Sequence, residues 1–277
     1  MVKYLLKKSY NRKNLKEKEF KDLWNAHGVF TTMWIYGKPQ KILFFKEHIT
    51  NLIKSAKTYK IYSKNLKSNI LKIIKTNLNK QKKYNHLLRI ALTKNLISIS
   101  LRDKLKIKRN LELKLVNYNR INPEYKNLKY KFILKNLSKM DNSKFDIALC
   151  SKGKILETGT SNIIFIKNNK YFSPSKKFYR GVNLRFFEKK FKIRKTNVYI
   201  NTLNEYDEIL LIGSGKGVST VSSIKEKNWK RRNYKSYEKF ISKYKTQITE
   251  QKELINYLWE TQIIHVFFAL QKRKIIF

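Results

Sequence analysis

Hydrophobic positions in the first 120 residues follow two different periods. Runs rich in β-branched and aromatic residues at 29–36 and 42–45, separated by a Gly-Lys-Pro turn, predict two strands. Residues 47–58 and 64–80 instead place hydrophobic side chains three and four positions apart, which predicts two amphipathic helices. Further strand-like runs are found at 87–92, 96–101 and 111–117. The pattern therefore predicts both strands and helices in this region.

After a turn at Asn122-Pro123 the pattern changes to one dominated by short strands. Residues 126–140 predict a short helix that crosses into this second half. The predicted strands there are 146–150, 154–157, 161–166, 197–200, 208–212 and 218–224, and the predicted helices lie near 181–190 and 236–246. We interpret this order as an α+β fold in two lobes. The lobes would span 1–121 and 122–246, and a helical extension would span 247–277.

The composition is that of a folded protein with a very basic surface. Of the 277 residues, 42% are hydrophobic and 13% aromatic, which is far from the composition of a disordered chain. The formal net charge of +44 comes mostly from lysines spread along the whole chain, which indicates a solvated lysine surface more than a face that reads nucleic acid. A polyanion site is the competing interpretation, and either surface would attract small acidic molecules.

Cysteine and histidine usage narrows the class of protein further. The single cysteine, Cys150, cannot form an intramolecular disulfide and fits a reducing compartment. The first residues lack the apolar segment of a signal peptide, and the longest apolar stretch, 263–270, is too short to cross a bilayer. The four histidines show no metal-ligand spacing. We expect a cytoplasmic protein with no metal centre and no membrane or specific nucleic-acid partner.

A glycine cluster gives the first indication of chemistry. Three of the eight glycines lie within 213–217, Gly-Ser-Gly-Lys-Gly, directly after the apolar run 209–212. Glycine is needed where the backbone takes a positive φ or where another group approaches closely. The cluster therefore predicts either an anion-binding loop or a tight turn between two strands. It matches neither the Walker A loop nor the dinucleotide-binding fingerprint.

Several motifs accompany this cluster in a fixed order. They are Gly28-Val29-Phe30-Thr31-Thr32, His48-Ile49-Thr50-Asn51-Leu52, Lys126-Asn127-Leu128-Lys129-Tyr130, Glu157 with Asn162-Ile163-Ile164-Phe165, Ser173-Pro174, Gly181-Val182-Asn183 and Ser214-Gly215. In this order and spacing the chain resembles the class IV aminotransferases, the fold-type IV pyridoxal-phosphate enzymes, over roughly residues 26 to 246. The family includes branched-chain and D-amino-acid aminotransferases and 4-amino-4-deoxychorismate lyase. The resemblance implies a smaller N-terminal lobe, a strand-rich pseudo-barrel in the C-terminal lobe, and a homodimer.

The resemblance also implies a role for each reactive side chain. Lys126 would bind pyridoxal 5′-phosphate covalently through its amine, with Lys129 and Lys131 as competing neighbours. Glu157 would keep the pyridine nitrogen of the cofactor protonated so that the ring can accept electrons, unless it is an ordinary surface carboxylate. Tyr130 would hydrogen-bond the ring hydroxyl or be a core aromatic residue.

The phosphate-binding positions match the family only in part. Backbone donors and hydroxyls are expected to bind the phosphate at Val182, Asn183, Ser214 and Gly215. Asn51, however, stands where the family carries the arginine that pairs with the phosphate, and Asn183 stands where it carries threonine. Lys54 or Lys216 could supply the missing positive charge. Otherwise the affinity for the cofactor is reduced and a catalytically inactive descendant becomes the alternative.

Thr31 bears on the reaction that the family resemblance implies. Transaminating relatives usually carry Glu in a Phe-Glu-Thr segment, whereas Phe30-Thr31-Thr32 resembles the Phe-Thr-Thr of aminodeoxychorismate lyases. We therefore expect a lyase that releases pyruvate and 4-aminobenzoate from aminodeoxychorismate, a small anionic substrate, with Lys126 and Thr31 as catalytic residues. A branched-chain or related amino-acid transaminase is the alternative. A catalytically inactive or polyanion-binding protein is a more distant one.

Overall fold

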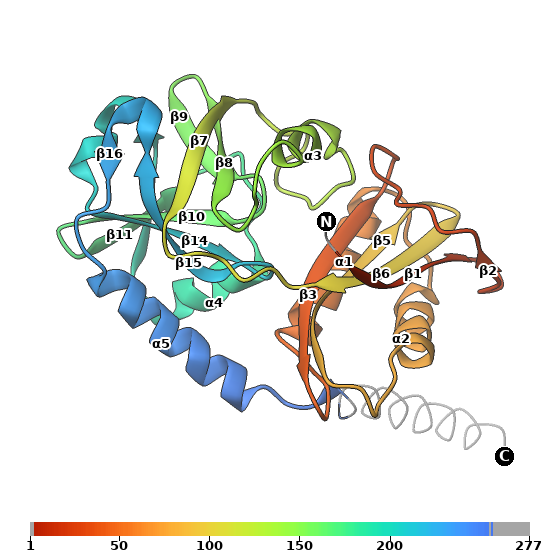
Figure 1. The fold of residues 1–277 in the computed structure, drawn as a ribbon. Helices are drawn as coiled ribbons and strands as arrows, with labels where there is room; N and C mark the ends of the chain where they lie inside the picture. Colours follow the sequence, from red (N-terminus) through yellow and green to blue (C-terminus); the bar gives the residue numbers. More distant parts are fainter. Residues whose placement is uncertain (1–2, 255, 257–277) are drawn as a thin grey trace, which may run out of the picture.

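The computed structural model describes residues 3–254 and 256, and two sheets divide these residues into two lobes (Figure 1). The sheet of the first lobe has six antiparallel strands in the order β2-β1-β6-β5-β3-β4. Its strands are β1 (Tyr4–Asn11), β2 (Glu17–Lys18), β3 (Val29–Gly37), β4 (Lys41–Ile42), β5 (Tyr84–Leu92) and β6 (Leu96–Asp103). Two helices, α1 (Phe45–Thr58) and α2 (Leu66–Asn77), pack their apolar sides against this sheet.

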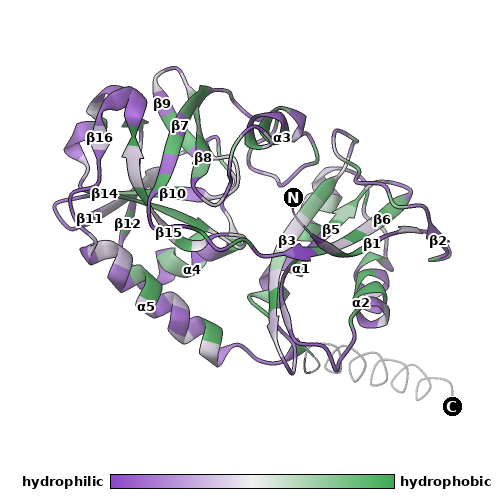
Figure 2. Cartoon of the chain, in the orientation of Figure 1, coloured by the Kyte–Doolittle hydropathy of each residue, from purple (hydrophilic) through white to green (hydrophobic). Residues whose placement is uncertain are grey.

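Burial in the first lobe follows the hydrophobic spacing of the sequence. Ile49, Leu52 and Ala56 lie on one side of α1 and share a core with Met33 and Ile35 of β3. Burying each large aliphatic side chain contributes about 1.5–3 kcal/mol. Figure 2 shows hydrophobic residues concentrated on the strands, with both hydrophobic and hydrophilic residues on the helices. The spacing therefore determines which side of α1 faces β3.

The sheet of the second lobe has ten strands with mixed pairing. Nine strands follow the order β12-β11-β10-β14-β15-β7-β8-β9-β13, and β16 pairs with β15. The strands are β7 (Leu111–Asn117), β8 (Phe145–Ser151), β9 (Lys154–Thr158), β10 (Asn162–Lys167), β11 (Lys170–Pro174), β12 (Ile193–Thr196), β13 (Val198–Tyr199), β14 (Glu208–Gly213), β15 (Gly217–Ile224) and β16 (Trp229–Lys230). Strand β7 runs parallel to both β8 and β15, and β11 runs parallel to β12.

Helices and 3-10 turns surround this second sheet. The helices are α3 (Lys131–Leu137), α4 (Val182–Lys190) and α5 (Lys235–Glu250), and the 3-10 turns are η1 (Ile200–Glu205) and η2 (Lys225–Lys227). Buried residues of α4 and α5, among them Phe187 and Phe240, pack against Leu210 and Ile212 of β14. None of the helices in the described part of the chain is long and apolar enough to span a membrane.

The end of α5 connects the second lobe back to the first. The Tyr36 hydroxyl in β3 donates a hydrogen bond to the carbonyl of Ile248 (2.8 Å), and the amide of Phe44 donates to Oε1 of Gln251 (3.0 Å). Leu254 is buried in the core of the first lobe. The described residues after 247 therefore pack against the first lobe, whereas most of the predicted helical extension at 247–277 lies outside the described residues.

The structure differs from the predicted elements at several places. Strands β1, β2, β11, β12 and β16 were not predicted, because most of them are short or, like β1 and β12, rich in exposed basic residues that hide the alternation. The strand predicted at 42–45 ends at Ile42, since Phe44 takes a left-handed φ of 55° and α1 begins at the next residue. The helix predicted at 126–140 is limited to α3, because the residues before it pair with the start of β3.

Candidate active site

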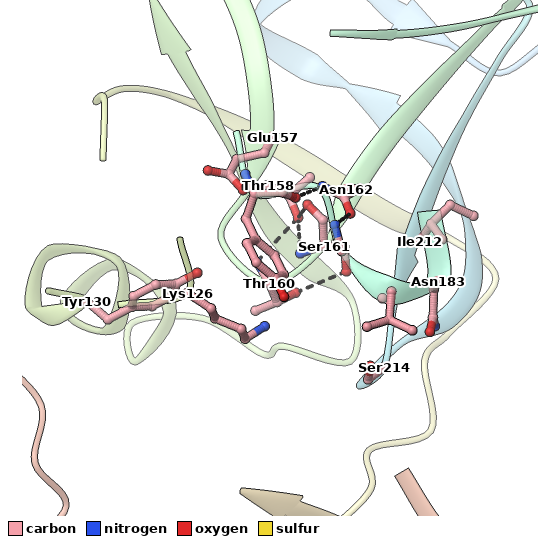
Figure 3. A pocket seen from close by; sticks show the side chains of 14 residues that line it. Lys126, Tyr130, Glu157, Thr158, Thr160, Ser161, Asn162, Asn183, Ile212 and Ser214 are labelled. Carbon is pink, nitrogen blue, oxygen red and sulfur yellow. Dashed lines mark hydrogen bonds between the residues drawn. The ribbon is translucent and has the colours of Figure 1, made fainter. Parts of the chain in front are cut away.

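A pocket with about 410 Å³ of empty space lies where four segments of the chain meet. The segment before α3 provides Lys126 and Tyr130, and the end of β14 provides Ile212, Gly213 and Ser214. The end of β9 and the start of β10 provide Glu157, Thr158, Thr160, Ser161 and Asn162. The start of α4 and the residues before it provide Tyr179, Gly181, Val182 and Asn183. Figure 3 shows Lys126 and Tyr130 on one side of the pocket, with Asn183 and Ser214 on the other. Six of the predicted site residues line this pocket, whereas Thr31 and Gly215 do not.

Glu157, in β9, forms a buried ion pair with Arg120. The Nε of Arg120 donates to Oε1 of Glu157 at 2.6 Å, and the two side chains are only 1% and 7% exposed. The backbone amide of Tyr179 donates to the second carboxylate oxygen at 3.4 Å. Burial raises the pKa of Glu157, and the Arg120 guanidinium opposes that rise. Glu157 is thus a fixed pocket residue and not a surface carboxylate.

Arg120 is held by the turn that precedes Lys126. Its terminal nitrogens donate to the carbonyls of Pro123 (2.6 Å) and Tyr125 (3.4 Å). The Asn127 side chain closes the same turn by donating to the carbonyl of Ile121 at 2.7 Å. The Arg-Ile-Asn-Pro segment therefore builds a rigid loop whose guanidinium points at Glu157.

Lys126 is positioned by the start of β3. Its carbonyl accepts a hydrogen bond from the amide of Phe30 at 2.8 Å, and the amide of Leu128 donates to the carbonyl of Gly28 at 3.0 Å. The amine lies 5.1 Å from the centre of the Phe30 ring and 5.4 Å from that of Tyr179. Burial, assisted by the charge of Arg120, lowers the pKa of Lys126 to about 8. Roughly a tenth of this amine is therefore uncharged at pH 7, far more than for an ordinary lysine.

The neighbouring lysines have a different environment. The Lys129 amine donates to the carbonyl of Asn25 at 2.8 Å, and Lys131 is exposed at the start of α3. Neither lines the pocket. Tyr130 does line it, with its ring edge-to-face against Phe30 (5.2 Å between centres), and burial raises the pKa of its hydroxyl to about 12.

The opposite end of the pocket combines a helix start with a strand turn. Gly181 precedes α4, and its amide donates to Oδ1 of Asn162 at 3.0 Å. The Asn183 side chain is buried, and its Nδ2 donates to the Tyr244 hydroxyl at 3.3 Å. Its Oδ1 has no hydrogen-bond partner among the described residues. Free backbone amides at a helix start attract anions.

The glycine cluster serves as a turn and also borders the pocket. Gly213 and Gly217 face each other in the β14–β15 hairpin, and Gly217 has a φ of +67°, which side chains rarely adopt. A Cβ at Gly213 would lie 2.8 Å from the Ser161 hydroxyl, so this glycine permits close packing beside the pocket. The tight-turn interpretation of the cluster is therefore confirmed, and the anion-binding interpretation stays a prediction.

The predicted replacements for the family's phosphate arginine lie elsewhere. Lys54 is exposed on α1, and Lys216 forms a buried ion pair with Asp146 at 3.5 Å. Asn51 itself donates to the Tyr179 hydroxyl at 3.5 Å. Arg185 is another candidate cation. It lies in the first turn of α4, and its charge lowers the pKa of His48 and opposes the rise in the pKa of Tyr179, but its side chain does not line the pocket.

Thr31 lies behind the pocket, not in its wall. It is 3% exposed, and its hydroxyl hydrogen-bonds Nδ1 of His48 at 2.8 Å. The other ring nitrogen of His48 hydrogen-bonds the Ser214 hydroxyl at 3.1 Å. Thr31 is therefore connected to the pocket through two hydrogen bonds.

Sequence reasoning missed Arg120, Arg185 and the role of His48. Arg120 could have been noticed from its place six residues before Lys126, next to the Asn-Pro turn. His48 stood in a motif without a role, because its partners come from β3 and from the β14–β15 turn, 17 and 166 residues away. Among 63 lysines and arginines, nothing in the sequence distinguishes Arg185.

The model of the amino-transferase class IV family matches residues 28–224. Similar solved structures include a branched-chain aminotransferase from Thermoproteus uzoniensis, with 15% identity and a TM-score of 0.70, covering 89% of this chain and 97% of that one. A putative 4-amino-4-deoxychorismate lyase from Legionella pneumophila has 18% identity and a TM-score of 0.65, covering 80% and 91%. A PLP-bound hypothetical aminotransferase from Mycobacterium tuberculosis has 13% identity and a TM-score of 0.66, covering 88% and 99%. No curated protein sequence matches the chain.

Together these comparisons cover the residues that build the pocket. The solved structures, at 13–18% identity, show a shared fold. The family match extends over most of the chain and includes the segments that carry Lys126, Glu157 and Ser214. Enzymes of this family use pyridoxal 5′-phosphate as their cofactor and act on amino acids and 2-oxo acids. The chain belongs to the class IV aminotransferases.

Proposed function

We propose that this protein is a pyridoxal-phosphate-dependent lyase that releases 4-aminobenzoate and pyruvate from 4-amino-4-deoxychorismate. The observation that carries the proposal is the charge of the site. The two acids beside the pocket, Glu157 and Asp146, are paired with Arg120 and Lys216 respectively. The side chain of Lys126 therefore faces the pocket without a competing free carboxylate among the described lining residues. A substrate with two carboxylates fits such a site better than a substrate with one.

The pocket suits the proposed cofactor at both of its ends. Glu157 can accept the proton of a pyridine nitrogen, and Lys126 provides an amine for covalent attachment. The Ser214 hydroxyl, the backbone amides at the start of α4 and Arg185 can bind a phosphate. If the Asn183 amide turns over, the Tyr244 hydroxyl donates to its oxygen and its NH₂ group faces the pocket. The buried oxygen of Asn183 that lacks a partner is thereby satisfied.

Each residue then has a stated task in the reaction. When bound, the cofactor withdraws electrons from the substrate carbon next to the amine. Lys126 Nζ, whose pKa of about 8 leaves part of it uncharged, can take up the proton of that carbon. Glu157 holds the proton on the ring nitrogen, and Arg120 keeps this carboxylate ionised and correctly oriented. Loss of pyruvate from the substrate ring leaves an aromatic product.

Thr31 supports the lyase over the transaminase. Transaminating relatives usually carry a glutamate at this position. Here a glutamate would place a carboxylate in a buried region that is separated from Ser214 by the ring of His48. The short neutral hydroxyl of Thr31 adds no negative charge there. Because Thr31 is neutral, it does not oppose the binding of a phosphate and a dicarboxylate in the same site.

Product analysis tests the proposed reaction. Purified protein with added pyridoxal 5′-phosphate should form pyruvate and 4-aminobenzoate from aminodeoxychorismate, and Thr31→Glu should slow this reaction more than any amino-group exchange. Conversion of branched-chain amino acids with 2-oxoglutarate, while aminodeoxychorismate stays untouched, would show that the transaminase alternative is correct.

Covalent attachment tests the cofactor assignment independently. Lys126→Ala should abolish both turnover and the visible absorbance of lysine-bound cofactor, while Lys129→Ala and Lys131→Ala retain them. Borohydride trapping of the cofactor on another lysine in Lys126→Ala would contradict the assignment. The homodimer implied by the family resemblance is also part of the proposal, and light scattering on the purified protein measures it.

A further inference from the structure

His48 joins three parts of the molecule at the phosphate end of the pocket. It lies near the start of α1, is 6% exposed, and uses both ring nitrogens: Nδ1 for Thr31 in β3 and Nε2 for Ser214 in the β14–β15 turn. Its amide donates to the carbonyl of Phe44 at 3.0 Å, which fixes the backbone that carries the ring. The ring therefore lies between the core of the first lobe and a hydroxyl that lines the pocket.

Two proton arrangements are compatible with these contacts. Burial, together with the charges of Lys126 and Arg185, lowers the pKa of His48 to about 3, so the ring is neutral near pH 7. A neutral imidazole has one donor and one acceptor nitrogen. Either Thr31 donates to Nδ1 and Nε2 donates to Ser214, or both hydrogen bonds run in the opposite direction.

The two arrangements differ in whether the Ser214 hydroxyl is a donor or an acceptor toward the pocket. In the first, the Ser214 oxygen accepts from His48, and its own proton is free to be donated into the pocket. In the second, that proton is used on Nε2, and only oxygen lone pairs face the pocket. An anionic oxygen is attracted by the first arrangement and repelled by the second.

We propose that Thr31 and His48 act as positioning residues that make Ser214 a hydrogen-bond donor to the phosphate group. This inference rests on the proposed function, because it takes the anion at Ser214 to be the phosphate of the cofactor. It assigns Thr31 a task that needs no contact with substrate: its hydroxyl donates to Nδ1 and holds the histidine proton on Nε2. The sequence position that separates lyases from transaminases thus also controls the phosphate site.

The tautomer of His48 tests this inference, with inorganic phosphate as the probe. Protein labelled with nitrogen-15 histidine contains four histidines, and a His48→Gln variant identifies the signals of His48. With saturating phosphate, correlation spectra of the imidazole should show the proton on Nε2. A phosphate-bound protein whose His48 carries its proton on Nδ1 overturns the inference.

A pair of variants gives a second readout that does not depend on activity. Thr31→Val keeps the shape of the side chain but cannot donate, and we expect it to weaken the binding of inorganic phosphate about three- to tenfold. The matched control is Thr32→Val, whose side chain lies on the other face of β3, and it should leave binding unchanged. In a Ser214→Ala background, Thr31→Val should cause no further loss. An equal loss in both backgrounds, or no loss in the wild-type background, contradicts the inference.

Failure of the proposed function has a different signature. A protein that attaches pyridoxal 5′-phosphate at Lys126 but shows the proton on Nδ1 retains the function and overturns the inference. A protein that attaches no cofactor but shows the Nε2 tautomer with inorganic phosphate and the loss in Thr31→Val overturns the function and retains the anion site. If Thr31→Val does not fold, the tautomer of the wild-type protein still decides the inference.

Discussion

The two ends of the pocket are built in different ways. At one end, Glu157 is held by Arg120 at 2.6 Å and by the backbone amide of Tyr179, and the side chains of Glu157 and Arg120 are both buried. At the other end, Asn183 has a buried oxygen without a partner among the described residues, and the family resemblance implies that Asn51 stands in place of an arginine. One end is complete before a ligand binds. At the other end, the donors proposed for a phosphate are the Ser214 hydroxyl, the backbone amides at the start of α4 and, once its amide turns over, the NH₂ group of Asn183.

Because the two ends are built differently, substitutions at each end should change different properties of the protein. A buried ion pair contributes little net stability, but removing one partner is costly because the other charge is left buried. The Glu157 end is therefore sensitive to any neutral substitution. At the other end, the proposed phosphate ligands are uncharged groups together with Arg185, so single substitutions there should mainly change the affinity for the cofactor.

The largest effect is expected for Glu157→Gln. The amide cannot neutralise the buried Arg120 guanidinium, so the free energy of unfolding should fall by about 3–5 kcal/mol. Denaturant unfolding of the cofactor-free protein measures this change. The control is Glu205→Gln, which breaks an exposed pair with Lys167 at 2.7 Å and should leave the unfolding midpoint nearly unchanged. Similar losses in the two variants would contradict the contrast between a buried pair and a surface pair.

The next effect concerns Arg185 at the phosphate end. Arg185→Gln should weaken the binding of pyridoxal 5′-phosphate by about 1.5–3 kcal/mol, roughly 10- to 150-fold, because a charge-assisted hydrogen bond is lost. Equilibrium titration followed by cofactor absorbance measures this. Lys189→Gln, an exposed position on the same helix, is the matched control. Pyridoxal without the phosphate should bind both variants like the wild-type protein, and a loss for pyridoxal as well would place Arg185 outside the phosphate site.

The pH dependence of cofactor attachment tests the lowered pKa of Lys126, which lies between the two ends. The depressed pKa of Lys126, about 8, means that the amine is mostly charged below this pH and mostly uncharged above it. The initial rate of attachment should therefore rise about tenfold per pH unit up to pH 8 and level off above it. Stopped-flow absorbance at low cofactor concentration follows this rate. A rate that still rises tenfold between pH 9 and 10 would indicate an ordinary lysine.

The same contrast explains how much of the site could be predicted from the sequence. Lys126, Glu157 and Ser214 belong to motifs with fixed spacing on strands and turns, so their convergence on one pocket could be expected. The proximity of Arg185 to His48 and Tyr179 could not be expected, because it depends on the rotation of α4 about its axis. The burial of His48 between two lobes depends on contacts between distant segments.

The elements of the fold could likewise be predicted only where the local sequence determines them. Elements with a clear hydrophobic period, such as α1 and β14, were predicted close to their final bounds. Strand β1 was missed because its lysines face solvent and it is defined by pairing with β6 over seven residues. Pairing between distant strands leaves little trace in local periodicity.

The smallest effect is expected from restoring the arginine of the family. Asn51→Arg should strengthen the binding of pyridoxal 5′-phosphate by only about 1 kcal/mol, roughly fivefold, because in our proposal Arg185 supplies one positive charge to this end. In the Arg185→Gln background the same substitution should recover more, since the phosphate then lacks its charged partner and the two changes are coupled. Asn51→Gln is the control, because it keeps an amide that can reach the Tyr179 hydroxyl. If Asn51→Arg improves binding equally with and without Arg185, the two arginines do not share one phosphate, and Arg185 does not replace the missing family residue.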